Sequence, residues 1–415
     1  MNFLPIAVHF IVLDIITAWG IKRTFPQFAS RYQRRIRYSI FIQSVVSVLI
    51  LVFGYYFDRQ IINYRLIALF YYIFGVLLVV YLPKTIFALF LFIDLFFAMF
   101  SKLYRRWFDI FPRGPRRIIA KCGIWTSAVF ACVIVWGILF GRNNISVDHV
   151  EIFIDDLPSA FNGYRIVQIS DLHAGSFWST EHFQKAVDLI NQQEPNLIVC
   201  TGDMVNNFAE EIVPLIPVFE QLKASDGKYA ILGNHDYGGY YDWKHPDDSI
   251  ANHHAFKAAI EQMGFVLLIN QSEIIYRYNS DCMALIGVEN WGKEKRFPKR
   301  AKLDKVMEPI QDISFKVLLT HNPIFWPYFV VENTDIVLTL SGHTHGMQMG
   351  VKLGKKRYSF ASRTVFRFQT GLHQINKQYL YVNRGLGVIG FPGRIGMPPE
   401  ITVINLWKTK PPEQQ

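Results

Sequence analysis

Four long apolar stretches occupy the first 140 residues of this 415-residue chain, and they limit what that part can fold into. A helix needs roughly 20 residues to cross about 30 Å of hydrocarbon. The stretches run from about Asn2 to Gly20, Tyr38 to Phe57, Tyr64 to Phe100 and Ile119 to Phe140. They predict an N-terminal α-helical transmembrane bundle over residues 1–145.

Positive charge between these stretches indicates how many of them cross the membrane. The loop after the first stretch contains Lys22, Arg23, Arg31, Arg34, Arg35 and Arg37, and the loop before the last contains Lys102, Arg105, Arg106, Arg113, Arg116, Arg117 and Lys121. Both loops favour the cytoplasm, so an even number of crossings must separate them. The third stretch, interrupted by Pro83, therefore counts as one kinked helix. We predict four spans, with five as the alternative, and a C-terminal domain on the non-cytoplasmic side.

The formal net charge of +10 belongs to this N-terminal part. Residues 1–145 hold 17 Lys and Arg against 4 Asp and Glu, whereas the rest of the chain holds 26 against 29. Basic residues between long apolar stretches favour contact with an anionic bilayer. The slightly acidic balance of the remainder argues against a large nucleic-acid surface, so no nucleic-acid partner is expected.

Two carboxylates, Asp14 and Asp94, lie within the apolar stretches, where an ionised group is costly. They have two explanations: a transport or relay site, or side chains that face the helix bundle or a helix end. With only two unconnected acids, the second explanation is favoured.

After Gly141 the pattern changes to alternating strands and helices, which predicts an α/β domain over residues 150–408. The predicted strands are Tyr164–Ile169, Leu197–Thr201, Lys228–Leu232, Met283–Val288, Phe315–Thr320, Asp335–Leu340, Tyr379–Val382 and Ile401–Leu406. The predicted helices are Thr180–Gln192, Ala209–Leu222 and Ile250–Met263. Residues 409–415 are expected to form a tail.

Polar motifs rich in histidine and acid follow five of these strands. In chain order they are Asp171-Leu172-His173, Gly202-Asp203, Gly233-Asn234-His235-Asp236, His321-Asn322-Pro323 and Gly342-His343-Thr344-His345. In open α/β sheets, functional groups gather beyond the carboxyl ends of the strands. Each motif alone is common, but five in series predict one shared site.

These motifs supply carboxylate, amide and imidazole groups and no thiolate. Such a set suits Mn, Fe, Zn or Co better than a structural zinc site or an all-oxygen calcium site. Seven ligands are too many for one ion. With one shared carboxylate they suit two ions about 3.5–4 Å apart, the arrangement that serves displacement at phosphorus. Two divalent metal ions are therefore expected as cofactors.

The series D-x-H, G-D, G-N-H-D, H and G-H-x-H resembles the signature of the calcineurin-like metallophosphoesterases over nearly all of residues 160–407. The segments 384–387 and 398–402, with the N-terminal helices, resemble the bacterial membrane-anchored branch of that superfamily. The resemblance implies a four-layer α/β/β/α sandwich behind the transmembrane bundle. It also implies a location in the bacterial plasma membrane.

The resemblance further implies a role for each motif residue. The expected ligands are Asp171, His173 and His345 for the first metal and Asn234, His321 and His343 for the second, with Asp203 bridging both. A hydroxide held between the metals would attack phosphorus. His235 would assist the leaving group, and Asp236 would orient His235 or its loop.

Several neighbouring residues carry weaker expectations. Asn206 and Met347 stand where that branch more often has Asp and Gly, which affects the surroundings of the site rather than its ligands. Tyr237, Tyr240, Tyr241 and Trp243 either line a substrate cleft or form a packed aromatic loop. Arg394 is expected to be a surface residue, with phosphate contact as the alternative.

The sequence thus predicts a membrane-anchored hydrolase of a phosphomonoester, phosphodiester or pyrophosphate. The short connection to the membrane favours a lipid-linked or envelope-derived substrate. The alternatives are a membrane sensor or transporter whose dimetal domain binds without turnover, and a nuclease-like phosphodiesterase. The presence of His235 argues against the first, and the charge of the domain argues against the second.

Overall fold

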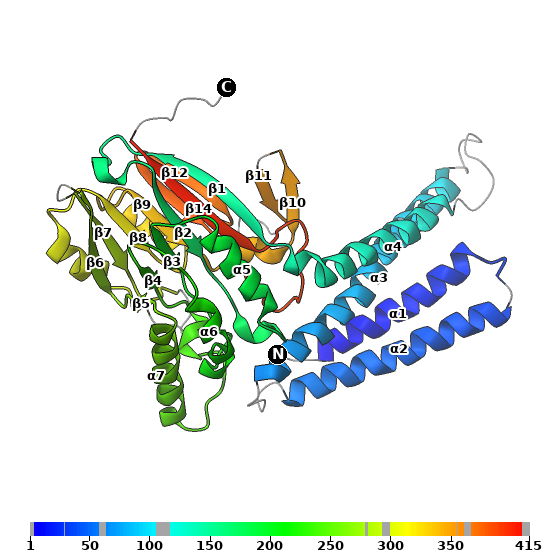
Figure 1. Cartoon of the computed structure of the whole chain (residues 1–415). Coiled ribbons are helices and arrows are strands. Elements are labelled where there is room, and N and C mark those ends of the chain that lie inside the picture. Colours follow the sequence, from blue (N-terminus) through cyan, green and yellow to red (C-terminus); the bar gives the residue numbers. More distant parts are fainter. Residues whose placement is uncertain are drawn as a thin grey trace. The chain divides into compact units, whose positions relative to one another are not determined.

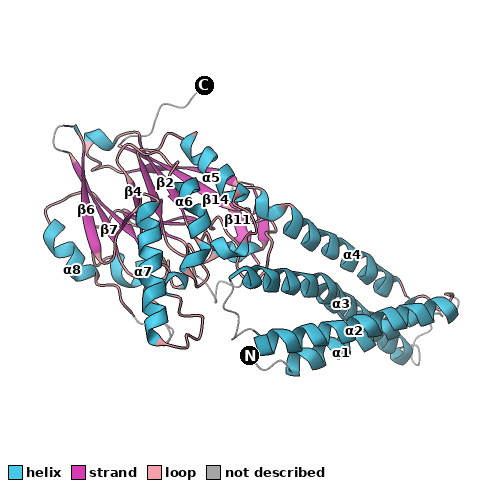
Figure 2. Cartoon of the chain, turned by 60° about the horizontal axis from the view of Figure 1, so that its bottom comes forward, coloured by secondary structure: helices cyan, strands magenta, loops and turns pink. Residues whose placement is uncertain are grey.

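The computed structural model describes residues 4–28, 30–57, 64–104, 117–278, 281–292, 299–354, 356–360 and 367–408. The chain divides into two compact units, Met1–Ile62 with Leu69–Ile138, and Asn63–Ala68 with Leu139–Gln415. The first is helical, and the second contains sheets and covering helices (Figures 1 and 2). The predicted tail and the basic residues between 105 and 116 lie outside the described residues.

The part of the helical unit that the structure describes contains four long helices. They are α1 (Leu4–Thr24), α2 (Ser30–Phe57), α3 (Tyr64–Tyr104) and α4 (Ile118–Leu139). Each contains a segment long and apolar enough to cross a membrane. The third apolar stretch forms one helix with Pro83 inside it, as the prediction of four spans requires.

Two glycines allow neighbouring helices to approach α3 closely. A Cβ atom at Gly20 of α1 would lie 2.6 Å from a methyl group of Leu91, and one at Gly123 of α4 would lie 2.5 Å from Cβ of Phe90. Small residues at such crossings are the usual means of packing helices in a bilayer. The helices of this unit therefore pack through backbone as well as side-chain contacts.

Both carboxylates within the apolar stretches face the interior of the helical unit and are ion-paired. Asp14 is buried and lies 2.5 Å from Lys84 Nζ, while the Tyr81 hydroxyl donates to its other oxygen at 3.1 Å. Asp94 is buried and lies 3.3 Å from a guanidinium nitrogen of Arg23. The prediction of bundle-facing carboxylates is therefore confirmed.

In its described residues, the second unit contains two six-stranded sheets and a separate hairpin. The first sheet has, in spatial order, β1 (Ser146–Phe153), β14 (Glu400–Trp407), β2 (Tyr164–Ile169), β3 (Leu197–Cys200), β4 (Lys228–Ala230) and β5 (Val266–Leu267). The second has β12 (Gly371–Ile375), β13 (Gln378–Val382), β9 (Leu338–Ser341), β8 (Lys316–Leu319), β7 (Cys282–Gly287) and β6 (Gln271–Tyr276). The hairpin pairs β10 (Gly350–Leu353) with β11 (Lys356–Ser359). The helices are α5 (Glu181–Asn191), α6 (Ile216–Phe219), α7 (Pro246–Gln262) and α8 (Leu303–Met307).

Alternation along the strands gives each large sheet two buried faces, and so creates three hydrophobic cores. Ile166 and other side chains on the facing surfaces form the core between the sheets. Its neighbour Val167 points the other way and packs with Phe183 of α5 in the second core. Ile286 of β7 packs with Trp326 in the third core, on the outer face of the second sheet. Three cores separate four layers, which is the predicted α/β/β/α sandwich.

The parallel strands of both sheets explain how distant motifs meet. Strands β2, β3 and β4 are parallel, as are β7, β8 and β9. The motifs follow β2, β3 and β4 in one sheet and β8 and β9 in the other. Their loops therefore leave the sheets at carboxyl ends, where functional groups of such sheets collect.

One predicted helix is wrong in its extent. The segment 209–222 contains two short 3-10 turns followed by the four-residue helix α6, rather than one continuous helix. Pro214 and Pro217 explain the difference, because each removes a backbone donor and crowds the preceding turn.

Candidate metal centre

The first group of candidate ligands comes from the loops after β2 and β9. Potential ligand atoms of Asp171, His173 and His345 all lie within 4.8 Å of one another. The Nε2 atoms of His173 and His345 are 3.1 Å apart, and Asp171 Oδ1 is 3.3 Å from His345 Nε2. Thus three residues separated by up to 174 positions in the chain converge on one small volume.

The second group comes from the loops after β3, β8 and β9. Asp203, His321 and His343 also place potential ligand atoms within 4.8 Å of one another. His321 Nε2 lies 3.1 Å from Asp203 Oδ2 and 3.1 Å from His343 Nδ1.

Asp203 lies between the two groups. Its Oδ2 atom, 3.1 Å from His321 of the second group, is also 3.8 Å from Nε2 of His173 in the first group. The other oxygen, Oδ1, accepts the backbone N–H of His235 at 2.8 Å. One carboxylate is therefore adjacent to both sets of candidate ligands.

Asn234, the remaining predicted ligand, has a buried acceptor available. Its amide nitrogen donates to the Tyr240 hydroxyl at 2.9 Å. Its Oδ1 atom is buried and has no hydrogen-bond partner within the part of the chain that the structure describes. A buried carbonyl oxygen without a donor is costly, and a cation would satisfy it.

Hydrogen bonds on the far side of two imidazoles fix which nitrogen carries the proton. His321 Nδ1 lies 2.7 Å from the Thr201 carbonyl, which can only accept, so Nδ1 is protonated. His173 Nδ1 lies 3.1 Å from Asn206 Oδ1, while the Asn206 amide nitrogen donates to Glu211 at 3.1 Å. In its neutral form each ring therefore presents an Nε2 lone pair to the ligand groups. This donor chemistry fits a pair of divalent cations.

The pKa values of the centre follow from burial and mutual charge. Burial lowers the pKa of His173 and His343 to about 3, so both rings are neutral near pH 7. Burial acts to raise the pKa of Asp203, but neighbouring His321 keeps it well below its ordinary value. Burial likewise acts to lower the pKa of His321, but Asp203 raises it to about 9. Negative potential is thus concentrated at Asp203, between the two groups.

Backbone strain is concentrated in the ligand loops. Five candidate ligands have left-handed backbone, with φ of 49° at Asp171, 43° at His173, 54° at Asp203, 72° at His343 and 52° at His345. A non-glycine residue in this region costs about 1–2 kcal/mol. Such strain persists only where surrounding contacts impose it, and it clusters at functional sites.

Glycines within the motifs are required by close approach to the ligands. A Cβ at Gly233 would lie 2.1 Å from Asp203 Oδ1. A Cβ at Gly342 would lie 2.0 Å from the Ser170 hydroxyl and 2.3 Å from Asp171 Oδ2. Any side chain at either position would displace a candidate ligand, which explains the glycine in these motifs.

His235 lies beside the candidate ligands but outside both groups. Its Nδ1 atom lies 2.8 Å from the Asn206 carbonyl, which can only accept, so Nδ1 carries a proton. Its ring stacks on Tyr240 at 4.2 Å and meets the edge of His173 at 4.9 Å. The side chain is only half-buried, so its Nε2 atom is the ring nitrogen left for a substrate.

Asp236 contacts backbone rather than the ring of His235. Its carboxylate accepts N–H groups of Asp203, Met204 and Gly233 at 2.8 Å and of Val205 at 3.3 Å. Of the two roles expected for it, these contacts match holding the loop.

Glu211 is a residue of the site that sequence reasoning missed. Its buried carboxylate accepts backbone N–H groups of Gly175, Asn206, Asn207 and Phe208 at 2.6–3.1 Å, in addition to the Asn206 amide. Nothing in the local sequence distinguishes it, because all of its partners are assembled by the folded loops.

Arg394 is buried, so the expectation of a surface residue was wrong. Its side chain is 1% exposed and donates to the carbonyl oxygens of Gly387, Arg384 and Met397. It also lies 3.4 Å from His345 Nδ1. The Arg394 guanidinium is thus surrounded by four uncharged acceptors. These partners allow the side chain to be buried, although its loop looks polar in the sequence.

The two explanations of the aromatic loop apply to different residues. Tyr240 is 39% exposed and contacts both Asn234 and His235. Tyr241 and Trp243 instead pack against Phe208, at 4.9 Å and 5.6 Å between ring centroids. Of these three residues, Tyr240 is the one that contacts candidate site residues, whereas Tyr237 contacts Glu289 and His253.

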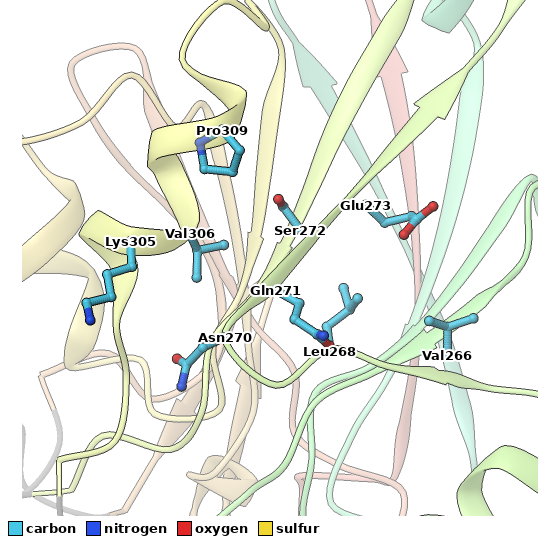
Figure 3. A pocket seen from close by; sticks show the side chains of 9 residues that line it. All are labelled: Val266, Leu268, Asn270, Gln271, Ser272, Glu273, Lys305, Val306 and Pro309. Atoms are coloured by element: carbon cyan, nitrogen blue, oxygen red, sulfur yellow. The ribbon is translucent and has the colours of Figure 1, made fainter.

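A separate pocket of about 440 Å³ lies at another part of the domain (Figure 3). It is lined by Val266, Leu268, Asn270, Gln271, Ser272, Glu273, Lys305, Val306 and Pro309. None of these is a candidate ligand, so the pocket is not part of the candidate centre.

Comparison with known protein families matches both parts of the chain. The family described as "Calcineurin-like phosphoesterase" matches residues 164–347. The family described as "Probable Calcineurin-like phosphoesterase, transmembrane domain" matches residues 1–142.

Similar proteins occur in bacteria and vertebrates. An "Uncharacterized metallophosphoesterase" of Bacillus subtilis is 29% identical over 257 residues, covering 61% of this chain and 82% of that protein. A zebrafish "Transmembrane protein with metallophosphoesterase domain" is 26% identical, covering 71% of this chain and 65% of that protein, slightly under two thirds of its length. A "Phosphodiesterase" of Escherichia coli is 26% identical over 59% of this chain and 82% of its own length.

Solved structures are matched at low similarity. A dimetal phosphatase from Danio rerio has a TM-score of 0.34 and 7% identity, covering 60% of this chain and 94% of that one. The family matches, which cover the N-terminal helices and the motif region, are the stronger finding. The chain therefore belongs to the calcineurin-like phosphoesterases, a family of metal-dependent phosphoester hydrolases, and carries their transmembrane domain at its N-terminal end.

Proposed function

We propose that Asp171, His173 and His345 bind one divalent cation, that Asn234, His321 and His343 bind a second, and that Asp203 is shared. The observation that supports this assignment best is the position of Asp203 Oδ2, 3.1 Å from His321 Nε2 and 3.8 Å from His173 Nε2. The nitrogen and oxygen donors suit Mn, Fe, Zn or Co. When bound, such cations supply Lewis acidity that neutralises phosphoryl charge and activates water.

His235 is the residue we assign to the leaving group. Its Nδ1 proton is engaged by the Asn206 carbonyl, so the other ring nitrogen is available to donate to the departing oxygen. Stacking on Tyr240 and the backbone bond to Asp203 hold the ring beside the ligands. A positioned acid of this kind contributes about 10²–10⁴ to rate.

Asp236 and Glu211 act as positioning residues. Asp236 gathers the backbone on both sides of Asp203 and so sets the place of the shared carboxylate. Glu211 holds the Asn206 amide, which orients His173. These contacts give the candidate ligands a fixed geometry before any substrate arrives.

The substrate we propose is a phosphomonoester, phosphodiester or pyrophosphate, lipid-linked or derived from the cell envelope. We place the catalytic domain, residues 150–408, on the non-cytoplasmic side of a bacterial plasma membrane, behind four spans in residues 1–145. The basic residues of the first loop and the single helix α3 support this topology.

The experiment is turnover by the purified full-length chain in detergent, with and without added Mn. The substrates are p-nitrophenyl phosphate, bis-p-nitrophenyl phosphate and a panel of lipid pyrophosphates. We expect hydrolysis that disappears with chelator and returns with Mn, and the preferred substrate identifies the ester class. No turnover on any substrate, by protein shown to carry two cations, would favour the non-catalytic sensor instead.

A further inference from the structure

The β10–β11 hairpin has an amphipathic pattern that the metal centre does not explain. Cross-strand partners share a face of a hairpin, and successive residues alternate between faces. The register pairs Val351 with Tyr358 and Leu353 with Lys356, and a bond from Phe360 N to Met349 O extends the ladder. Val351, Leu353, Tyr358 and Phe360 therefore lie on one face, which we call the apolar hairpin face.

The apolar hairpin face is open to solvent. Leu353 and Phe360 are 64% and 65% exposed, and Tyr358 and Val351 are 42% and 38% exposed. Figure 1 shows the hairpin standing apart from both large sheets, and it forms its own two-stranded sheet. Four large apolar side chains on one exposed face are typical of a surface that binds something apolar.

The charge of the same segment indicates what it binds. Residues 350–360 contain four Lys and Arg and no Asp or Glu, although the chain beyond residue 145 is slightly acidic as a whole. Lys356 is exposed opposite Leu353 on the apolar hairpin face, and Lys352 is exposed on the other face of the hairpin. Cations next to exposed apolar side chains match an anionic bilayer surface. A second copy of the chain would instead bring like charges together.

The base of the hairpin is fixed to a loop that also holds the start of the catalytic unit. Gly350 N donates to Ile395 O at 2.8 Å, and Arg357 donates to Gly396 O at 3.2 Å. Arg142, which is 4% exposed, donates to Pro392 O at 3.4 Å and to Ser176 O at 3.1 Å. The loop 392–396 therefore connects Arg142 to the hairpin.

Arg142 is also close in the chain to a membrane span. It is the third residue after Leu139, the last residue of α4, so the backbone allows about 10 Å between them at most. The loop that carries the hairpin is thus attached within a few residues of a helix that can cross the bilayer. This short attachment favours lipid as the occupant of an apolar surface on the hairpin.

We propose that the β10–β11 hairpin docks into an anionic membrane surface through the apolar hairpin face. The hairpin follows the last candidate ligand closely, since only four residues separate His345 from Gly350. Docking would hold the metal centre at the lipid headgroups. This inference rests on the proposed function, and it makes the substrate a phosphoester carried by a membrane lipid rather than a freely soluble one.

The test measures where the hairpin lies, without requiring turnover. Leu353→Cys is labelled with an environment-sensitive dye in the full chain, after Cys122, Cys132 and Cys282 are replaced by Ser; Cys200 is buried. The protein is reconstituted in liposomes of phosphatidylcholine with phosphatidylglycerol, with doxyl-labelled lipid as quencher. The matched control is Leu372→Cys on β12, an apolar position 41% exposed on another sheet.

We expect the dye at 353 to shift to the blue and to be quenched by doxyl lipid, and the dye at 372 to do neither. Lys352→Glu with Lys356→Glu should reduce the quenching in phosphatidylglycerol liposomes. A dye at 353 that behaves like the one at 372 would overturn the docking. A blue shift that depends on protein density and not on doxyl lipid would assign the face to a second copy, and overturn it as well.

A second measurement separates docking from substrate choice. Leu353→Glu with Phe360→Glu should leave hydrolysis of p-nitrophenyl phosphate unchanged. Hydrolysis of a lipid phosphomonoester in liposomes by this variant should fall about tenfold or more. The reason is that withdrawing each large apolar side chain from lipid lowers the affinity for the membrane by about that factor. Equal rates on the lipid for variant and wild type would refute the lipid substrate. If the wild-type chain hydrolyses neither substrate while the dye at 353 is still quenched, the proposed function is refuted and the docking is not.

Discussion

The Nε2 atoms of His173 and His345 lie 3.1 Å apart, although the two residues leave different sheets. The Asn206 amide oxygen holds the proton of His173 on Nδ1, so its Nε2 atom offers a lone pair towards the other ring. Asp171 Oδ1 is 3.3 Å from the same His345 nitrogen. Donor atoms so close together, in a site from which water is largely excluded, match a cation between them.

Asn206→Ala should weaken metal binding without removing a ligand. The variant leaves His173 free to rotate and to protonate on either nitrogen, and loss of such an orienting partner typically costs 10–100-fold in metal affinity. Metal titration of the apoprotein by calorimetry measures the effect. Asn191→Ala, which removes two amide hydrogen bonds at the exposed end of α5, is the control and should bind metal normally. An unchanged affinity for Asn206→Ala would show that the amide does not orient His173.

Lys84→Met should destabilise the helical unit. It leaves the buried Asp14 carboxylate without its cation, and breaking a buried pair in this way costs about 3–5 kcal/mol. Thermal unfolding of the full chain in detergent, followed by helical circular dichroism, detects the loss. The double variant Lys84→Met, Asp14→Leu removes both charges and should recover much of the stability. A double variant that is less stable than Lys84→Met would show that Lys84 does not stabilise the unit through its ion pair with Asp14.

A reporter fused after Gln415 tests the topology. We expect a reporter that works only outside the cytoplasm to be active there, because the basic loops require an even number of crossings between them. A second fusion, at the loop after α1, serves as the internal reference and should favour a cytoplasmic reporter. Cytoplasmic activity at both points would contradict the arrangement with four spans.

The regular parts of the fold could be predicted from the sequence. The predicted strand Tyr164–Ile169 agrees with β2 at both ends, because this largely apolar segment is bounded by Gly163 on one side and by Ser170 and Asp171 on the other. Strands β1 and β12 were not predicted, because both mix polar and apolar residues and neither is a continuous apolar run. The hairpin was missed because each of its strands is only four residues long and contains Lys or Arg beside its apolar positions.

The motifs predict that the candidate ligands converge, but the sequence does not predict which residues hold those ligands in place. Asp203, His321 and His343 meet because strand ends in parallel sheets share an edge. Glu211 and Arg394 act through backbone groups, and sequence does not reveal which carbonyl or N–H a side chain will meet. Their positions follow only from the folded loops.

His235→Ala separates catalysis from metal binding. The ring lies outside both ligand groups, so metal content should hardly change, while the rate should fall by about 10²–10⁴. Alkyl phosphoesters should lose more than p-nitrophenyl phosphate, because a poor leaving group depends more on protonation. Parallel rate measurements on both substrates, with metal content determined for each preparation, check this. Equal losses would indicate that His235 stabilises phosphoryl charge instead, and no loss would remove its catalytic role.

The most direct test of the dimetal account is the metal content and activity of Asp203→Asn. The substitution keeps the size of the side chain but removes the negative charge shared by the two groups, which lies 3.1 Å from His321 Nε2 and 3.8 Å from His173 Nε2. Elemental analysis of purified wild type and variant is paired with turnover of p-nitrophenyl phosphate in Mn. We predict two ions per wild-type chain, and loss of bound metal together with nearly all activity in the variant. A variant that retains two ions and turns over at the wild-type rate would contradict the account.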